Sequence, residues 1–170
     1  MIKLVPVKDT LQVEDIAQMA EVIWREHYLP ILGEEQISYM LATLQSEEKM
    51  VQDIASGQTE YFIIEAGFLE IGYLAIEWQE STLFLSKLYL LNEARGHGHA
   101  YTILKQLIQM ATVREVINIE LTVNKHNTGA IRFYEKAGFR QIDAVVSDIG
   151  GGYVMDDYVY RLEIEKNMEP

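Results

Sequence analysis

The first third of the chain places hydrophobic residues every three or four positions, which is the period of a helix with one buried face. A short apolar run over residues 2–8 precedes this pattern and predicts a strand. Asp9 and Thr10 then offer side-chain oxygens that can cap the first helix, and Pro30 and Gly33 are expected to end it. The stretch that follows predicts two helices or one broken helix, with Ser46 as a new N-cap.

From residue 61 onward the hydrophobic period changes to two, which is typical of strands. Three runs, 61–66, 70–78 and 82–91, are rich in β-branched residues, aromatic residues and leucine, and short turns join them. They predict an antiparallel meander. A Gly-rich turn, a helix and a strand over 116–123 come next, so the strands over 82–91 and 116–123 are expected to run parallel.

The last part of the chain predicts one short helix and two strands. Residues 127–137 have helical spacing and are followed by Gly138, a residue type that commonly ends helices. The strands are expected over 139–146 and 153–164, on either side of a turn of three glycines. Neither a repeat nor a linker interrupts the chain, so residues 1–170 are predicted to form a single domain.

The composition supports one globular domain and excludes several kinds of chemistry. The chain has 170 residues, of which 49% are hydrophobic and 24% charged, and this is enough for one hydrophobic core. It contains no cysteine, which excludes a disulfide, a thiolate nucleophile and a cysteine-ligated metal. No signal-peptide core and no run of about 18 apolar residues appears, so we expect a cytoplasmic protein that does not bind membranes.

The charge of the chain is strongly negative and unevenly distributed. A formal net charge of -12 argues against non-specific binding to nucleic acid or an anionic membrane and favours cationic partners. Residues 92–140 are the exception, with 7 Lys and Arg against 4 Asp and Glu. This basic segment is a candidate anion site, although local charge also varies by a few units in any chain.

A Gly-rich turn within this segment connects a predicted strand to a predicted helix. Backbone amides at such a junction point the same way, and the helix dipole adds positive potential, so the turn can hold a phosphate. Gly96 and Gly98 let the backbone approach a ligand, and Arg95 supplies a charged donor. A tight connection without a ligand would have the same composition, so the turn alone leaves both readings open.

Two common phosphate motifs do not fit this turn. A Walker A loop requires Lys followed by Ser or Thr, whereas His99 and Ala100 stand there. A dinucleotide fingerprint requires a third glycine, and Tyr101 occupies that position.

Two segments resemble the GNAT superfamily of N-acetyltransferases. Residues 95–100, Arg-Gly-His-Gly-His-Ala, match its R/Q-x-x-G-x-G/A signature, and residues 127–139 resemble its N-x-x-A-x-x-x-Y-x-K-x-G-F pattern. Both motifs stand in the expected order and separation, and the match is specific over roughly residues 83–140. Leu91 and Asn92 depart from the Asp-Pro that members often have there.

The resemblance implies a fold, a co-substrate and a reaction. The fold class is α/β (α+β), with a mixed, mostly antiparallel sheet of about seven strands, splayed centrally and flanked by about four helices. The chain would be a single N-acetyltransferase domain that uses acetyl-CoA and no metal. The acetyl group would pass directly to the acceptor amine, and the missing cysteine excludes an acetyl-cysteine intermediate.

The resemblance also assigns roles to individual residues. Backbone groups around Leu88 would bind the pantetheine arm and the thioester oxygen, the turn would bind the pyrophosphate, and Asn127 would contact the arm. Tyr134 would face the departing sulfur and stabilise the thiolate, although an aromatic side chain packed beside Phe133 would look the same in the sequence. The cofactor-binding residues implied are Leu88, Tyr89, Leu90, Arg95, Gly96, His97, Gly98, His99, Ala100, Asn127 and Tyr134.

The general base and the acceptor pocket are less well marked. Strand alternation allows Glu77 to point into the cleft as a general base, but a Glu near a strand end is more often solvated. The candidate acceptor-binding residues are Asp156 and Asp157 on the last strand and His27 and Tyr28 at the end of the first helix.

Three functions from different classes remain open. The favoured one is acetyl transfer to a primary amine of a small, cationic molecule. The alternatives are a protein or peptide N-acetyltransferase and a non-catalytic CoA-binding sensor with the same fold. Exposed strand edges and family precedent favour a homodimer.

Overall fold

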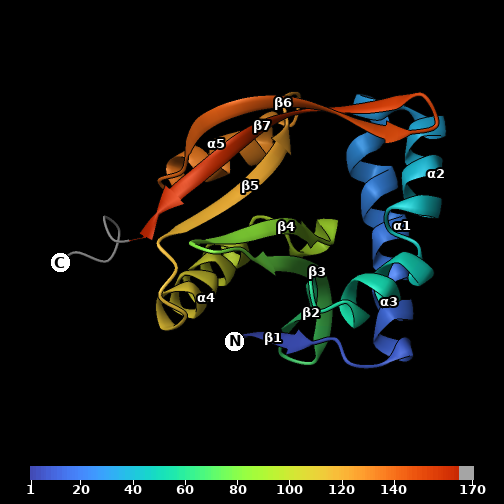
Figure 1. Cartoon of the computed structure of the whole chain (residues 1–170). Helices are drawn as coiled ribbons and strands as arrows, with labels where there is room; N and C mark the ends of the chain where they lie inside the picture. Colours follow the sequence, from blue (N-terminus) through green and yellow to red (C-terminus); the bar gives the residue numbers. More distant parts are fainter. Residues whose placement is uncertain (165–170) are drawn as a thin grey trace. The chain divides into compact units, whose positions relative to one another are not determined.

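The computed structural model describes residues 1–164, which form seven strands, five α-helices and one 3-10 helix (Figure 1). About seven strands and about four helices were expected, and the structure has seven strands and five α-helices. In chain order the elements are β1 (Ile2–Pro6), α1 (Thr10–Leu32), α2 (Glu34–Thr43), α3 (Glu47–Ala55), β2 (Glu60–Ala66), β3 (Leu69–Trp78), β4 (Thr82–Leu90), η1 (Asn92–Ala94), α4 (His99–Val113), β5 (Asn118–Asn124), α5 (Thr128–Lys136), β6 (Arg140–Gly150) and β7 (Tyr153–Glu163).

The strands form one mixed, mostly antiparallel sheet in the order β1-β2-β3-β4-β5-β7-β6. The pairs β1–β2, β2–β3, β5–β7 and β7–β6 are antiparallel. β4 and β5 are parallel, with Thr82 opposite Asn118 and Phe84 opposite Glu120. This confirms the strand–helix–strand crossover predicted from the sequence. The central splay of the sheet stays a prediction.

The chain divides into two compact units. Among the described residues, the first contains 1–77 and 87–103, and the second contains 78–86 and 104–164. β4 and α4 are therefore each shared between the units. The end of β4 and the Gly-rich turn belong to the first unit, whereas Asn127 and Tyr134 belong to the second.

In the first unit, α1 packs against α2 and α3, and α3 contacts β2 (Figure 1). The predicted caps are confirmed: the Gln12 amide donates to the Asp9 carboxylate at 2.9 Å, and Ser46 caps α3. The expectation that Pro30 helps to end the first helix is wrong, because α1 continues to Leu32. Proline lacks only its own amide donor, and the last turn is closed by the Gly33 amide, which donates to the Leu29 carbonyl at 3.1 Å.

A chain of hydrogen bonds between buried side chains crosses the core of the first unit. Trp24 Nε1 donates to the Tyr73 hydroxyl at 2.9 Å, and that hydroxyl donates to Gln45 Oε1 at 3.3 Å. Gln45 Nε2 in turn donates to the Tyr61 hydroxyl at 3.2 Å. A buried polar group without a hydrogen-bond partner destabilises the fold. The Tyr73 hydroxyl is the partner of both the Trp24 indole NH and the Gln45 side-chain oxygen.

We expect Tyr73→Phe to lower the free energy of unfolding by about 1–3 kcal/mol, because the Trp24 and Gln45 groups lose a buried partner. Urea denaturation measures this change. Tyr101→Phe is the matched control, since the Tyr101 side chain is 45% exposed. Equal stability of the two variants would contradict a structural role for the buried network.

In the second unit, β5, β7 and β6 form an antiparallel ribbon, and α5 packs on one face of it. The Tyr160 hydroxyl on β7 donates to Glu135 of α5 at 3.2 Å. β6 is longer than predicted, because residues 147–150 keep pairing with β7 and the turn is confined to Gly151 and Gly152. Both of these glycines have positive φ angles, as a tight hairpin turn requires.

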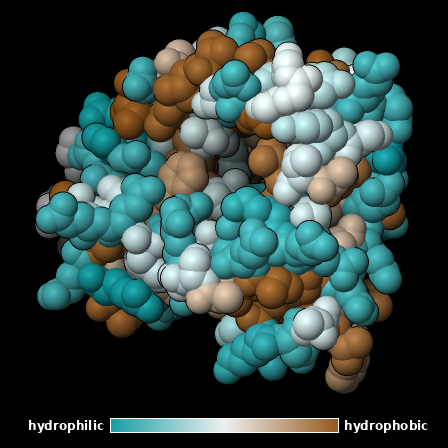
Figure 2. Space-filling model, turned by 45° about the vertical axis from the view of Figure 1, so that its right-hand side comes forward, coloured by the Kyte–Doolittle hydropathy of each residue, from teal (hydrophilic) through white to brown (hydrophobic). Residues whose placement is uncertain are grey.

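The surface is mostly hydrophilic on the face shown in Figure 2, with separate hydrophobic patches. Exposed large hydrophobic residues include Phe68, Leu69 and Val146. Within residues 1–164, no helix is both long and apolar enough to cross a membrane.

Candidate functional site

The Gly-rich turn follows β4 and η1 and leads directly into α4, which begins at His99. Gly96 and Gly98 have φ angles of +79° and +78°, a backbone conformation that glycine adopts without steric cost. The Thr102 amide donates to the Gly98 carbonyl at 3.3 Å and closes the first turn of the 15-residue helix. The first amides of a helix point outward along its axis, so this end of α4 is suited to an anion.

The basic side chains of the turn are accessible. Arg95 is exposed, and its Nε donates to the Leu90 carbonyl at 3.2 Å, which ties the turn to the end of β4. A guanidinium has further donors beyond the one used here. His97 is exposed, His99 is half-buried, and their ring centroids lie 5.8 Å apart.

The end of β4 lies very close to β3 at Gly72. A Cβ atom added at Gly72 would lie 2.1 Å from the Tyr89 carbonyl oxygen and 3.0 Å from Leu90 Cα. The Leu91 amide donates to the Ile71 carbonyl at 2.8 Å beside this contact. Only glycine therefore allows the Tyr89–Leu90 backbone to take this position. Gly72 was not among the site residues predicted from the sequence, although a glycine inside a strand is itself a sign of close backbone approach.

Aromatic side chains join α1 to the same end of β4. The hydroxyls of Tyr28 and Tyr89 are hydrogen-bonded at 3.0 Å, and the Tyr89 ring also lies beside Trp24 and Tyr73, at centroid distances of 5.7 and 5.5 Å. The structure thus brings a predicted acceptor residue, Tyr28, to a predicted cofactor residue, Tyr89. This aromatic cluster therefore includes Tyr89, whose backbone lies against Gly72.

His27 belongs to the same region. Its ring centroid lies 4.8 Å from that of Tyr28, and both residues lie one turn before the end of α1 rather than at its end. Burial lowers the pKa of His27, and the positive charge of Arg95 lowers it further. Arg95 of the Gly-rich turn is therefore close enough to His27 of α1 to affect its protonation.

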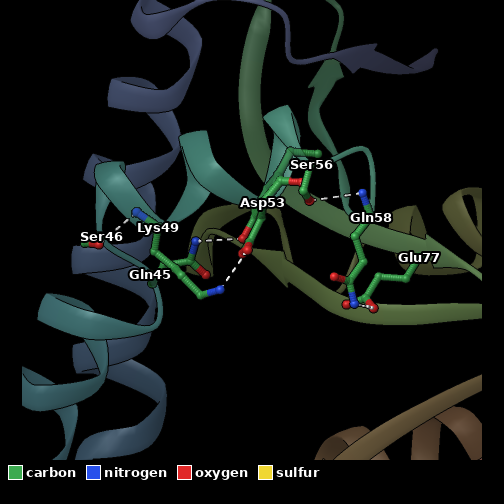
Figure 3. Close-up of polar contacts among 8 residues, drawn as sticks. Gln45, Ser46, Lys49, Asp53, Ser56, Gln58 and Glu77 are labelled. Atoms are coloured by element: carbon green, nitrogen blue, oxygen red, sulfur yellow. Dashed lines mark hydrogen bonds and ion pairs between the residues drawn. The ribbon is translucent and has the colours of Figure 1, made fainter.

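Glu77 lies near the end of β3 and is half-buried. In Figure 3 its carboxylate faces Gln58, whose Nε2 donates to Glu77 Oε1 at 3.5 Å. Lys49 and Asp53 form an ion pair at 2.7 Å in the same view. A side chain with one long hydrogen bond is compatible with either a solvated or a catalytic carboxylate, and the role of Glu77 as general base stays a prediction.

In the second unit, α5 positions Asn127 and Tyr134. Asn127 is the N-cap, and its Oδ1 accepts from the Ala130 amide at 3.3 Å. The cap uses the side-chain oxygen and not the NH₂ group, and the contact of Asn127 with the cofactor stays a prediction. Tyr134 is 9% exposed, and its ring packs at centroid distances of 5.2 and 5.3 Å from Phe133 and Phe139. These two ring contacts help to hold the phenol.

The two acidic residues on β7 differ in their partners. Asp156 forms an ion pair with Lys125. Asp157 Oδ1 is buried and accepts no hydrogen bond from the residues that the structure describes. Burial, and secondarily the charge of Asp156, raises the pKa of Asp157 to about 6. Neighbouring strand residues alternate between faces, so the two carboxylates serve different environments.

No group of three or more His, Asp or Glu side chains within residues 1–164 is arranged to hold a metal ion. The turn is the part of the first unit that is suited to an anionic ligand, because it combines a helix start, two glycines and an arginine.

Comparison with known proteins gives consistent similarities. A family model described as an acetyltransferase (GNAT) domain matches residues 28–154. The spermidine N(1)-acetyltransferase of Thermoplasma acidophilum is 26% identical over 145 residues, which cover 81% of this chain and 90% of that protein.

Two solved structures share the fold. The PaiA N-acetyltransferase of Thermoplasma acidophilum in complex with coenzyme A has a TM-score of 0.78 and 21% identity, and covers 96% of this chain and 99% of its own. Spermidine N-acetyltransferase from Vibrio cholerae in complex with CoA and spermine has a TM-score of 0.69 and 17% identity, with 99% and 98% covered. At these identities the two likenesses establish the fold alone, and they confirm the predicted fold class.

Proposed function

Because the chain belongs to the acetyltransferase (GNAT) domain family, we propose that this N-acetyltransferase moves the acetyl group of acetyl-CoA directly to a primary amine of a small, cationic molecule. The observation that carries the proposal is the turn before α4, where Gly96 and Gly98 both have positive φ angles and Arg95 is exposed. This turn lies within the matched domain.

The first unit supplies the residues proposed to hold acetyl-CoA. The pyrophosphate would lie on the backbone amides from Gly96 to Ala100, with Arg95 and the two histidines beside it. The backbone of Leu88–Leu90, which Gly72 positions, would hydrogen-bond the pantetheine arm and the thioester oxygen. The cofactor-bound structures of the two fold relatives named above support this choice of co-substrate.

The second unit supplies the group proposed to act at the leaving sulfur. Acetyl-CoA provides the acetyl group as an activated thioester, and the attacking amine must be neutral. With ordinary pKa values near ~10 for a phenol and ~8.5 for a thiol, complete proton transfer from a free phenol to a free thiolate is uphill by roughly 2 kcal/mol. Tyr134 therefore stabilises the thiolate by donating a hydrogen bond. Asn127 would contact the arm, and Glu77 is the proposed general base.

The acceptor is proposed to be a small polyamine or a similar amine. The net charge of -12 attracts cations. The relative from Thermoplasma acidophilum is named a spermidine acetyltransferase, which makes spermidine the first acceptor to test.

Calorimetric titration with acetyl-CoA, followed by turnover assays on an amine panel, tests the proposed function. We expect acetyl-CoA to bind and spermidine or another small amine to be acetylated, with release of free CoA thiol. Binding without turnover of any amine would favour a CoA-binding sensor, and acetylation confined to lysines or N-termini of proteins would favour a protein acetyltransferase. Absence of acetyl-CoA binding would contradict all three.

We also propose a homodimer in the cytoplasm. β6 lies at the edge of the sheet, and its Ile142 and Val146 side chains are 39% and 67% exposed. A second copy would cover them. Light scattering coupled to size-exclusion chromatography measures the mass in solution, and a monomer at all concentrations would contradict the dimer.

A further inference from the structure

Buried polar atoms in folded proteins are nearly always hydrogen-bonded, and an exception calls for an explanation. Among the buried side-chain nitrogen and oxygen atoms of residues 1–164, Asp157 Oδ1 is the one without a hydrogen-bond partner. The residue as a whole is half-buried, so part of the carboxylate still reaches the surface. A carboxylate in this position has lost hydration without gaining a protein donor.

The strands on either side of Asp157 do not supply what it lacks. On β5 the residue opposite is Asn124, whose Oδ1 accepts from the His126 amide at 2.9 Å and whose side-chain NH₂ group donates no hydrogen bond to Asp157 Oδ1. On β6 the residue opposite is Val145, which has no polar side-chain atom. Lys125 follows directly after β5, and its ammonium group forms an ion pair with Asp156 and not with Asp157.

The lack of a partner lowers the stability of the folded protein, because the carboxylate is charged at neutral pH. Burial and the negative charge of Asp156 raise the pKa of Asp157 to about 6, so Asp157 is ionised above that pH. An unpaired, partly buried negative charge destabilises a folded protein. A positively charged ligand at this carboxylate would offset that cost.

We propose that the carboxylate of Asp157 binds an ammonium group of the acceptor and thereby selects acceptors that carry a second cationic amine. This inference rests on the proposed acetyltransferase function. The attacking amine must be neutral, so the ammonium bound by Asp157 is a second group that does not react. Asp157 is a specificity-determining residue in this scheme, and Asp156 is not, because Lys125 already neutralises it.

Kinetics with a pair of acceptors of equal chain length test the proposal. The probes are 1,4-diaminobutane and butylamine, and the variants are Asp157→Asn and the matched control Asp148→Asn, an exposed aspartate whose Oδ1 accepts from the Gly150 amide, as an asparagine Oδ1 also can. We expect Asp157→Asn to raise the KM for the diamine by about tenfold, because a charge-assisted hydrogen bond is lost. The kcat/KM for butylamine and the dissociation constant of acetyl-CoA should stay within about twofold of wild type, and Asp148→Asn should behave as wild type does.

Stability provides a second readout that a structural role would not give. The raised pKa means that the folded protein binds more protons than the unfolded chain between about pH 4 and pH 6, so the charged form of Asp157 destabilises the fold above pH 6. We therefore expect Asp157→Asn to raise Tm at pH 8. Below about pH 4 the substitution should leave Tm unchanged, because the Asp157 carboxyl is then neutral in the folded protein and in the unfolded chain. A merely structural carboxylate would lower Tm when replaced.

The outcomes separate this inference from the function on which it rests. If wild type acetylates the diamine and Asp157→Asn gives the same ratio of diamine to butylamine KM, the role of Asp157 is overturned while the acetyltransferase stands. A fall in Tm at pH 8 would overturn it as well. If wild type binds acetyl-CoA but acetylates neither probe nor any other amine, both proposals fail.

Discussion

Replacing Gly72 by alanine is expected to lower kcat/KM for acetyl transfer by about a hundredfold. The added Cβ would lie 2.1 Å from the Tyr89 carbonyl oxygen, whereas ordinary contacts begin at 3.4 Å, so the β4 backbone must move by more than an ångström. That backbone is the segment proposed to hold the thioester, and a misplacement of about 1 Å costs about 10²-fold in rate. Steady-state kinetics and acetyl-CoA titration measure the two effects.

The same substitution should also lower the free energy of unfolding, by about 1–3 kcal/mol, because a close-packed region is overfilled. Gly129→Ala is the matched control: nothing lies within 4 Å of its added Cβ, and the residue is in the first turn of α5. Alanine there should leave kinetics and stability close to wild type. Wild-type kinetics for Gly72→Ala, with the control also normal, would show that the Leu88–Leu90 backbone does not hold the cofactor.

The features that the sequence predicted well depend on local chemistry. Asp9 and Ser46 cap helices because each side-chain oxygen reaches an amide three residues ahead, which requires no knowledge of the rest of the fold. Gly96 and Gly98 take positive φ angles because glycine has no Cβ atom, which is also a property of the residue itself. Pro30 was misread because helix termination depends on whether the next turn can still close, and it does close on Gly33.

The features that the sequence could not supply depend on contacts between distant segments. Gly72 and Tyr89 meet only because β3 and β4 pair in one particular register, and periodicity does not reveal that register. Asp156 and Asp157 are neighbouring residues of the same type, so the sequence does not distinguish their roles. In the structure Lys125 forms an ion pair with Asp156, whereas Asp157 Oδ1 has no hydrogen-bond partner within residues 1–164. In the same way, the hydrogen bond between Tyr28 and Tyr89 joins residues 61 positions apart.

Replacing Tyr134 by phenylalanine is expected to lower kcat by about a hundredfold and to leave the fold unchanged. The phenylalanine ring keeps the contacts with Phe133 and Phe139, so the variant should still fold. The lost hydroxyl no longer donates a hydrogen bond to the departing thiolate, and such a donor is worth about 10²–10⁴-fold in rate. Single-turnover kinetics with saturating acetyl-CoA measure the effect directly.

The leaving group separates this role from a structural one. A donor thioester with a more acidic thiol needs less stabilisation of its thiolate, so the rate lost in Tyr134→Phe should shrink with that donor. Tyr160→Phe is the matched control, because it removes the hydroxyl that donates to Glu135 and should cost about 1 kcal/mol of stability without changing kcat. If kcat for Tyr134→Phe equals that of wild type, or if the loss is the same for every thioester, the phenol does not act at the sulfur and packs only as a core aromatic side chain.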